Sequence, residues 1–319
     1  MSTTISWVCE TPGHPVHYVR CLAPVFYGAQ NLYSAGIKVI QGYIPDADTY
    51  VFQRPFKASL PLIKQAKTNG HVVLFDFDDP LWLIARDENR NQVGTEYTKN
   101  LVECIKYCDG IICSTEPLAD SLKQHVYSKL IKQCKPHIPN LPPIVVFTNA
   151  AQPCPTPTSH DLTIFWGGCG NSKLAQVDNA WIEALKVKAA EGFKIVSAVD
   201  IPIPQEKFEV TNWANFLSSV ASYRPLYYVA PLKDNPEAQC KSDLKELEAW
   251  RLGAKFVGQG PCYSNGLPFN ATKQEILNAF DTATIPHFDA TRDMGSLTYT
   301  EYWATIYTGE WLTQLGRIN

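Results

Sequence analysis

Short apolar runs rich in β-branched residues alternate with helical segments along this chain, and this alternation constrains the fold more than any other feature. In the first half, such runs predict strands over residues 5–9, 37–41, 49–53, 71–75, 110–114 and 144–147. The intervening segments predict helices over residues 17–33, 58–67, 96–107 and 116–126. Strands that alternate with helices form parallel sheets covered on both faces. The first half therefore predicts one doubly wound α/β domain.

A proline-dense segment, residues 136–157, follows this series and surrounds its last strand. Proline lacks a backbone N–H and has a fixed φ, so this density is typical of an interdomain connection. A second series then predicts strands over 162–166, 193–198, 226–230 and 255–258, and helices over 178–190, 212–221, 242–252 and 273–282. We therefore expect two domains, residues 1–155 and 156–297.

The C-terminal stretch carries tyrosine, tryptophan and isoleucine at helical spacing over residues 298–315. This spacing predicts an amphipathic helix that packs on one or both domains, within a C-terminal segment of residues 298–319.

Composition excludes several classes of protein. Hydrophobic residues make up 45% of the 319 residues and charged residues 18%, which is typical of an ordered globular chain. The net charge of −3 gives no global attraction to nucleic acid. The N-terminus lacks a signal-peptide pattern and no window is apolar enough to span a membrane, so we expect a soluble, cytoplasmic protein. The ten cysteines are scattered without a CxxC pair, which indicates reduced thiols rather than disulfides or a zinc site.

The segment after the predicted strand 226–230 has the chemistry of a nucleotide site. In open α/β sheets, ligands bind beyond the carboxyl ends of the strands, where helix N-termini attract anions. Lys241 adds a positive charge there, and Ser242 is a suitable N-cap for the next helix. Glu248 lies six residues later, where it can reach ribose hydroxyls. The alternative is that Lys241, Lys245 and Glu248 are surface charges of an amphipathic helix.

A glycine-rich turn follows the strand 162–166, in the sequence TIFWGGCGNSK. Gly167 and Gly168 allow close backbone approach to a phosphate, and Lys173 can neutralise it. A glycine turn alone is a weak signal.

Residues 229–257, VAPLKDNPEAQCKSDLKELEAWRLGAKFV, resemble the donor-site block of GT-B glycosyltransferases, particularly compact phage and bacterial group 1-like members. GIICSTEPLADSL and VVFTNAA resemble further blocks of that family. The resemblance implies two Rossmann-like domains that face a cleft, with the C-terminal helix packing across. It also implies that Glu248 contacts the ribose and that Lys241 and Ser242 lie at the phosphate end. Larger retaining members carry a sugar-contacting glutamate where this chain has Cys240, which leaves the sugar open.

An acidic cluster, Asp76, Asp78 and Asp79, follows the predicted strand 71–75. Such a cluster needs compensation by a metal, by basic residues or by protons. One interpretation is a metal-binding Asp-x-Asp motif, as in the other common glycosyltransferase architecture or in a phosphohydrolase. The GT-B resemblance instead places the cluster in the acceptor domain, where Asp78 or Asp79 orients the acceptor hydroxyl or acts as base. We favour this second interpretation, with no metal.

Basic residues follow two other strands of the first domain. His14, His17 and Arg20 come directly after the first strand, and Arg54 comes after the third. We predict that His17, Arg20 and Arg54 bind the acceptor and that His14 is a catalytic candidate. The alternative for the histidines is a solvated loop.

The combined hypothesis is a glycosyltransferase that moves a sugar from a nucleoside diphosphate sugar, UDP type favoured, to an acceptor hydroxyl. The resemblance implies a retaining, metal-independent enzyme without a cofactor, with its donor in the second domain. The acceptor is a glycan or a hydroxymethylated base in phage DNA, the latter placing the enzyme in a host cytoplasm. Two alternatives are a noncatalytic nucleotide- or sugar-binding protein and a metal-dependent phosphotransfer enzyme that uses Asp76 and Asp78.

Overall fold

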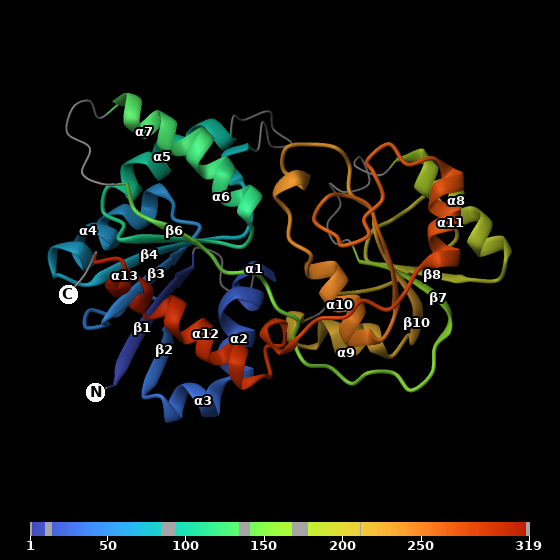
Figure 1. Cartoon of the computed structure of the whole chain (residues 1–319), viewed down its shortest axis with the longest axis horizontal. Coiled ribbons are helices and arrows are strands. Elements are labelled where there is room, and N and C mark those ends of the chain that lie inside the picture. The colour runs from blue at the N-terminus through green and yellow to red at the C-terminus, as the bar shows by residue number, and fades with distance from the viewer. Residues whose placement is uncertain are drawn as a thin grey trace. The chain divides into compact units, whose positions relative to one another are not determined.

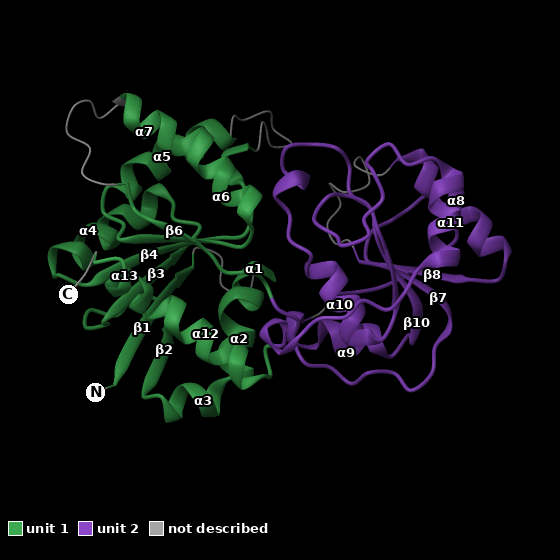
Figure 2. Ribbon diagram, viewed as in Figure 1, with its two compact units in different colours: residues 1–149, 294–319 green, residues 150–293 purple. Residues whose placement is uncertain are grey.

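The computed structural model of the chain describes residues 2–9, 15–83, 93–133, 141–167, 178–210 and 212–316 (Figure 1). The chain forms two compact units (Figure 2). Unit 1 comprises residues 1–149 and 294–319, and unit 2 comprises residues 150–293. The chain thus enters unit 2 near residue 150, where we predicted a boundary at 155, and leaves it near 293, where we predicted 297.

Unit 1 is built on a six-stranded, fully parallel sheet of order β2-β1-β3-β4-β5-β6. The central strands are buried on both faces, and every residue of β3 is buried. Such strands read as continuous apolar runs rather than as alternating ones. The strands are β1 (Thr3–Cys9), β2 (Ile37–Gln41), β3 (Thr49–Gln53), β4 (Val72–Phe77), β5 (Gly110–Cys113) and β6 (Ile144–Val146).

Two long helices predicted in unit 1 are segmented. The predicted helix 17–33 consists of α1 (Pro15–His17), the π-helical turn η1 (Tyr18–Leu22), α2 (Ala23–Tyr27) and α3 (Ala29–Ser34). Gly28 separates α2 from α3, and a Cβ there would lie 2.8 Å from the side chain of Thr300. The predicted helix 116–126 consists of α6 (Glu116–Leu122) and the π-helical turn η4 (Lys123–Tyr127). Three further helices of this part of the chain are α4 (Leu60–Thr68), α5 (Val93–Ile105) and α7 (Ser128–Gln133).

Unit 2 is built on a five-stranded, fully parallel sheet of order β11-β10-β7-β8-β9. The strands are β7 (Asp161–Trp166), β8 (Lys194–Ser197), β9 (Glu206–Lys207), β10 (Pro225–Ala230) and β11 (Lys255–Gly258). The helices are α8 (Asn179–Ala190), α9 (Phe216–Ala221), α10 (Leu244–Leu252) and α11 (Lys273–Thr282). Strand β9 was not predicted, because its two exposed, charged residues carry no apolar pattern.

Alternate residues of the strands in unit 2 pack on opposite faces of its sheet. Tyr227 and Val229 of β10 belong to a core shared with α8 and α11. Tyr228 belongs to a second core, shared with Phe216 of α9 and Ala249 of α10. The period of two along a strand therefore directs Tyr228 toward the helix that carries the predicted nucleotide residues.

The C-terminal segment returns to unit 1 as α12 (Leu297–Tyr307) and α13 (Glu310–Gln314). We predicted one helix over 298–315, but Gly309 has φ +82° and separates the two helices. Trp303 and Tyr307 are buried against Trp7 of β1, at ring-centroid distances of 6.1 and 4.7 Å. The indole N–H of Trp303 donates to the backbone oxygen of Arg20 at 3.1 Å.

Two negative findings concern the part of the chain that the structure describes. None of its helices is long and apolar enough to cross a membrane. Its eight cysteines are all free thiols, and burial raises the pKa of Cys104 to about 12. That thiol therefore remains protonated near neutral pH.

Candidate nucleotide-binding site

The carboxyl edge of the sheet in unit 2 brings the ends of β7 and β10 together. The N–H of Gly167, directly after β7, donates to the oxygen of Val229 at 2.8 Å. Beyond β10 the chain forms a turn in which Asn235 accepts from the N–H of Ala238 at 2.7 Å. A short 3-10 helix, η7 (Ala238–Cys240), then leads to Lys241 and the start of α10.

Helix α10 begins at Leu244, two residues later than predicted. Asp243 occupies the N-cap position, so our assignment of Ser242 as N-cap is wrong. The Asp243 side chain makes no capping hydrogen bond and instead accepts from the guanidinium of Arg292 at 2.6 Å. Lys241 and Ser242 are half-buried immediately before this end of the helix. Arg292 thus places a positive charge beside Asp243 at a helix terminus that itself favours anions, and Lys241 directly precedes that terminus in the chain.

Glu248 lies in the second turn of α10 and is only 6% exposed. Its Oε2 accepts a hydrogen bond from the phenol of Tyr228, and Lys245 Nζ donates to Oε1 at 2.9 Å and to Oε2 at 2.8 Å. Lys245 lies 5.3 Å from the ring centroid of Phe216. A carboxylate offers about four acceptor positions. Among the described residues, only Lys245 donates to Oε1, so this oxygen retains acceptor capacity for a ligand.

Gly167 lies against the ring of Tyr228, whose hydroxyl bonds to Glu248. A Cβ at position 167 would lie 2.2 Å from Cε1 and 2.7 Å from the hydroxyl oxygen of Tyr228. From the sequence we interpreted Gly167 as a residue that allows close backbone approach to a phosphate. The structure gives a second reason for the glycine, since the ring of Tyr228 occupies the space that a side chain would need. Gly167 and Glu248 are therefore brought together through Tyr228. Gly168 and Lys173 lie outside the described residues.

Two residues at this site were missed by the sequence reasoning. Tyr228 lies inside an apolar strand, where the only signal was its alternation onto the face shared with α10. Arg292 is 49 residues beyond Asp243 in sequence. Its backbone oxygen accepts from the N–H of Ala151 at 2.9 Å, and its guanidinium lies over the Phe288 ring at 5.3 Å. No local pattern connects Arg292 with α10.

The acidic cluster of unit 1 is divided between the core and the sheet edge. Asp76 is fully buried and pairs with Arg20 at 2.6 Å. Asp78 and Asp79 lie at the carboxyl end of β4 and both accept from Arg54, at 2.8 and 2.6 Å. A basic residue thus partly compensates their charge. This is one of the three kinds of compensation considered from the sequence, the others being a metal and protons. Arg54 has φ +52°, a strained backbone for a non-glycine residue.

Arg20 and His17 are buried in unit 1, each only 2% exposed. Arg20 bonds to Asp76, to the oxygen of Phe147 at 2.6 Å and to Asn149 at 3.2 Å. Burial also lowers the pKa of His17. Both residues follow β1 but point into the domain, so we withdraw them as acceptor contacts and retain Arg54. His14 lies outside the described residues.

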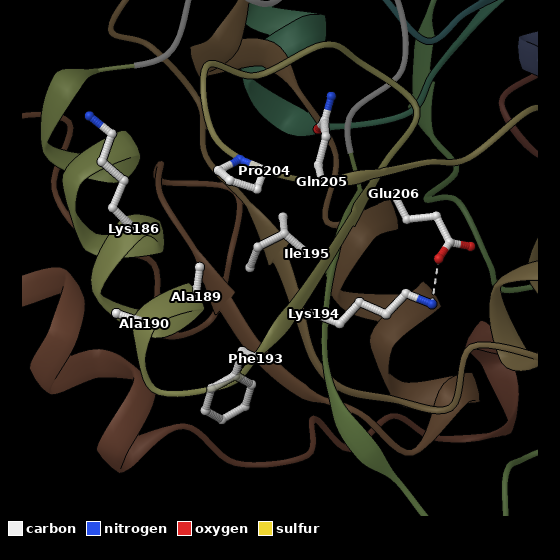
Figure 3. Close-up of a pocket in the computed structure, with 9 residues that line it drawn as sticks. All are labelled: Lys186, Ala189, Ala190, Phe193, Lys194, Ile195, Pro204, Gln205 and Glu206. Carbon is white, nitrogen blue, oxygen red and sulfur yellow. Dashed lines mark ion pairs between the residues drawn. The ribbon is translucent and has the colours of Figure 1, made fainter.

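The described residues contain no group of three histidine, cysteine, aspartate or glutamate side chains arranged to hold a metal ion. A concavity of about 650 Å³ does occur in unit 2, but at the amino ends of β8 and β9, opposite the carboxyl edge (Figure 3). Lys194 and Glu206 pair at 2.5 Å along its wall. It is therefore separate from the predicted nucleotide residues.

Comparison with solved structures places this arrangement in a known architecture. The Anabaena protein HepE, solved in complex with UDP, superposes with a TM-score of 0.50 over 98% of both chains, at 10% identity. The chain has the GT-B fold. This confirms the predicted fold class, and within the GT-B fold unit 2 is the one that carries the predicted donor residues.

Two other solved structures match with TM-scores below 0.5. The Methanocaldococcus jannaschii UDP-GlcNAc 2-epimerase, in complex with UDP-GlcNAc and UDP, has a TM-score of 0.47 at 9% identity, over 96% of this chain and 100% of that one. The pneumococcal O-GlcNAc transferase GtfA, in complex with UDP and GlcNAc, has a TM-score of 0.47 at 12% identity, over 93% of this chain and 59% of that one. No protein-family model and no curated protein matches the sequence.

Proposed function

We propose that this protein is a glycosyltransferase whose second unit binds a nucleoside diphosphate sugar, with UDP as the nucleotide. The observation that carries the proposal is the paired arrangement on α10. Lys241 and Arg292 supply positive charge at the N-terminus of α10, beside the acidic Asp243 and Glu246, and a buried carboxylate with spare acceptor capacity, Glu248, lies one turn further on. The GT-B fold, shared with a protein that binds UDP, supports the nucleotide assignment.

The chemistry assigned to the site is transfer of the sugar to an acceptor hydroxyl. The bond between the anomeric carbon and the diphosphate breaks, a bond from that carbon to the acceptor oxygen forms, and the hydroxyl proton passes to a base. Lys241, Arg292 and the terminus of α10 stabilise the negative charge on the departing diphosphate. Metal-independent departure and retention of configuration are proposed on the resemblance. The sugar itself is open because Cys240 stands where larger retaining members carry an earlier, sugar-contacting glutamate.

We assign the acceptor side to Asp78 and Asp79, held by Arg54. The full chain carries a net charge of −3 at pH 7. Such a charge favours the neutral hydroxyls of a glycan over the phosphodiesters of DNA, since DNA binding is driven largely by contacts of basic residues with phosphates. Glycan is therefore the proposed acceptor class, and a salt-sensitive shift of DNA on a gel would instead support the modified base.

The experiment that tests the donor site compares UDP with UMP by calorimetry. UDP should bind the wild type about tenfold more tightly, because its second phosphate gains a charged hydrogen bond. Lys241→Ala should abolish this preference, whereas Glu248→Gln should weaken both nucleotides and preserve it. Lys186→Ala is the matched control, since Lys186 lies on α8 with Glu183 as its partner and should leave both affinities unchanged.

Turnover is then measured with a panel of UDP-sugars and glycan acceptors. Release of UDP with formation of a glycosylated product supports the proposal. Conversion of the nucleotide sugar to an epimer, with no UDP released in proportion, would replace transfer by epimerisation. Absence of UDP binding by the wild type would refute the donor site.

A further inference from the structure

Tyr228 occupies a position that packing alone does not explain. It is fully buried in β10, where it lies 5.4 Å from the Phe165 ring centroid in the core shared with α9 and α10. A phenylalanine would fill this space equally well, and a buried hydroxyl costs free energy unless it is hydrogen-bonded. The hydroxyl meets its requirement by donating to Glu248. The adjacent strand end carries Gly167, whose missing side chain leaves room for this ring.

Glu248 is held from two directions. Tyr228 reaches it from the sheet, and Lys245 reaches it from one turn earlier on the same helix. Both donors bind Oε2, which fixes the plane of the carboxylate. Lys245 is itself positioned by the Phe216 ring. The acceptor capacity left on Oε1 is consequently presented in one orientation instead of being spread over the rotamers of a flexible side chain.

We infer that Tyr228 is a positioning residue that fixes Glu248 to receive a ribose hydroxyl, and that it thereby sets the preference of the enzyme for ribonucleotide over deoxyribonucleotide donors. The inference rests on the proposed function, because it assumes a nucleotide at this site. According to this inference, strand β10 contributes to substrate selection through the hydroxyl of Tyr228. A site built to accept a hydroxyl discriminates against a ligand that lacks it, because a buried polar group then stays unpaired.

The test measures selectivity rather than stability. Calorimetry gives the affinities of UDP, 2′-deoxy-UDP and 3′-deoxy-UDP for the intact protein and its variants. We expect the wild type to bind at least one deoxy compound about tenfold more weakly than UDP, the usual effect of one hydrogen bond to a charged group. Tyr228→Phe should reduce that ratio to about threefold or less while preserving the preference for UDP over UMP.

Two further variants separate positioning from packing. Tyr227→Phe is the control, because Tyr227 is the neighbouring residue of the same strand and packs on the opposite face of the sheet. It should leave the ratio unchanged. Lys245→Met removes the second anchor of Glu248 and should lower the ratio as Tyr228→Phe does, which keeps the inference testable if the tyrosine variant fails to fold.

The outcomes are distinguishable. A wild-type ratio of one, or an unchanged ratio in Tyr228→Phe whatever happens to its melting temperature, overturns this inference and leaves the proposed nucleotide site standing. A wild type that does not bind UDP at all overturns both. A reduced ratio in Tyr228→Phe and Lys245→Met, with an unchanged ratio in Tyr227→Phe, supports the inference.

Discussion

Arg20 and Asp76 form an ion pair that is shielded from water inside unit 1, and their partners show how a buried charge is stabilised. Asp76 also accepts from the phenol of Tyr307 at 2.8 Å, and Arg20 also donates to Phe147. Burial opposes the charge on Arg20, but Asp76 holds the pKa of the guanidinium above its ordinary value. The pair also lies at the point where α12 meets β1 and β4, so its hydrogen bonds connect the C-terminal helix to the sheet.

Removing one member of this pair should be costly. Arg20→Met leaves the carboxylate of Asp76 without its charged partner, and the free energy of unfolding should fall by about 3–5 kcal/mol. Replacing both, as Arg20→Met with Asp76→Leu, should recover part of this loss because no lone buried charge remains. Urea unfolding measures both values. A loss below about 1 kcal/mol for the single variant would contradict the structural role assigned to the pair.

At the scale of elements, most strands could be predicted within two residues because each is a short run rich in apolar, β-branched residues. The failures have local physical causes. Strand β9 is too short and too polar to show a pattern. Gly28 and Gly309 interrupt helices at points where another segment packs closely or the backbone has a positive φ, and an apolar spacing does not reveal either condition.

Helices α12 and α13 follow unit 2 in sequence yet complete the core of unit 1. Trp303, Tyr307 and Leu312 are at most 1% exposed, and Trp311 lies against Gly110 of β5. Truncation after Asp293 should therefore expose a large apolar surface of unit 1 and leave unit 2 intact.

Hydrogen exchange measures this effect by region. Backbone amides of β1, β3 and β4 should lose protection in the truncated chain, while those of β7 and β10 retain it. Equal loss in both sheets, or no loss in either, would contradict the assignment of the C-terminal segment to unit 1.

At the scale of the whole molecule, the sequence could predict the GT-B fold and a motif on α10, but only part of the candidate site. Lys241 and Glu248 lie within one local sequence pattern, so their spacing was enough to predict them as site residues. Tyr228 and Arg292 come from a strand and from the end of the unit, and only the folded chain brings them to α10. For Arg20 the sequence prediction was wrong. Its position after a strand suggested a ligand contact, but the folded chain buries its side chain.

The central claim is that unit 2 binds a nucleoside diphosphate across the start and second turn of α10. A crystal structure of the protein grown with UDP tests it most directly. We predict the diphosphate within hydrogen-bonding distance of Lys241 and the N-terminus of α10, and a ribose hydroxyl on Oε1 of Glu248, with Tyr228 still bonded to Oε2. UDP bound elsewhere, such as in the concavity beside Lys194 or in unit 1, would contradict the claim.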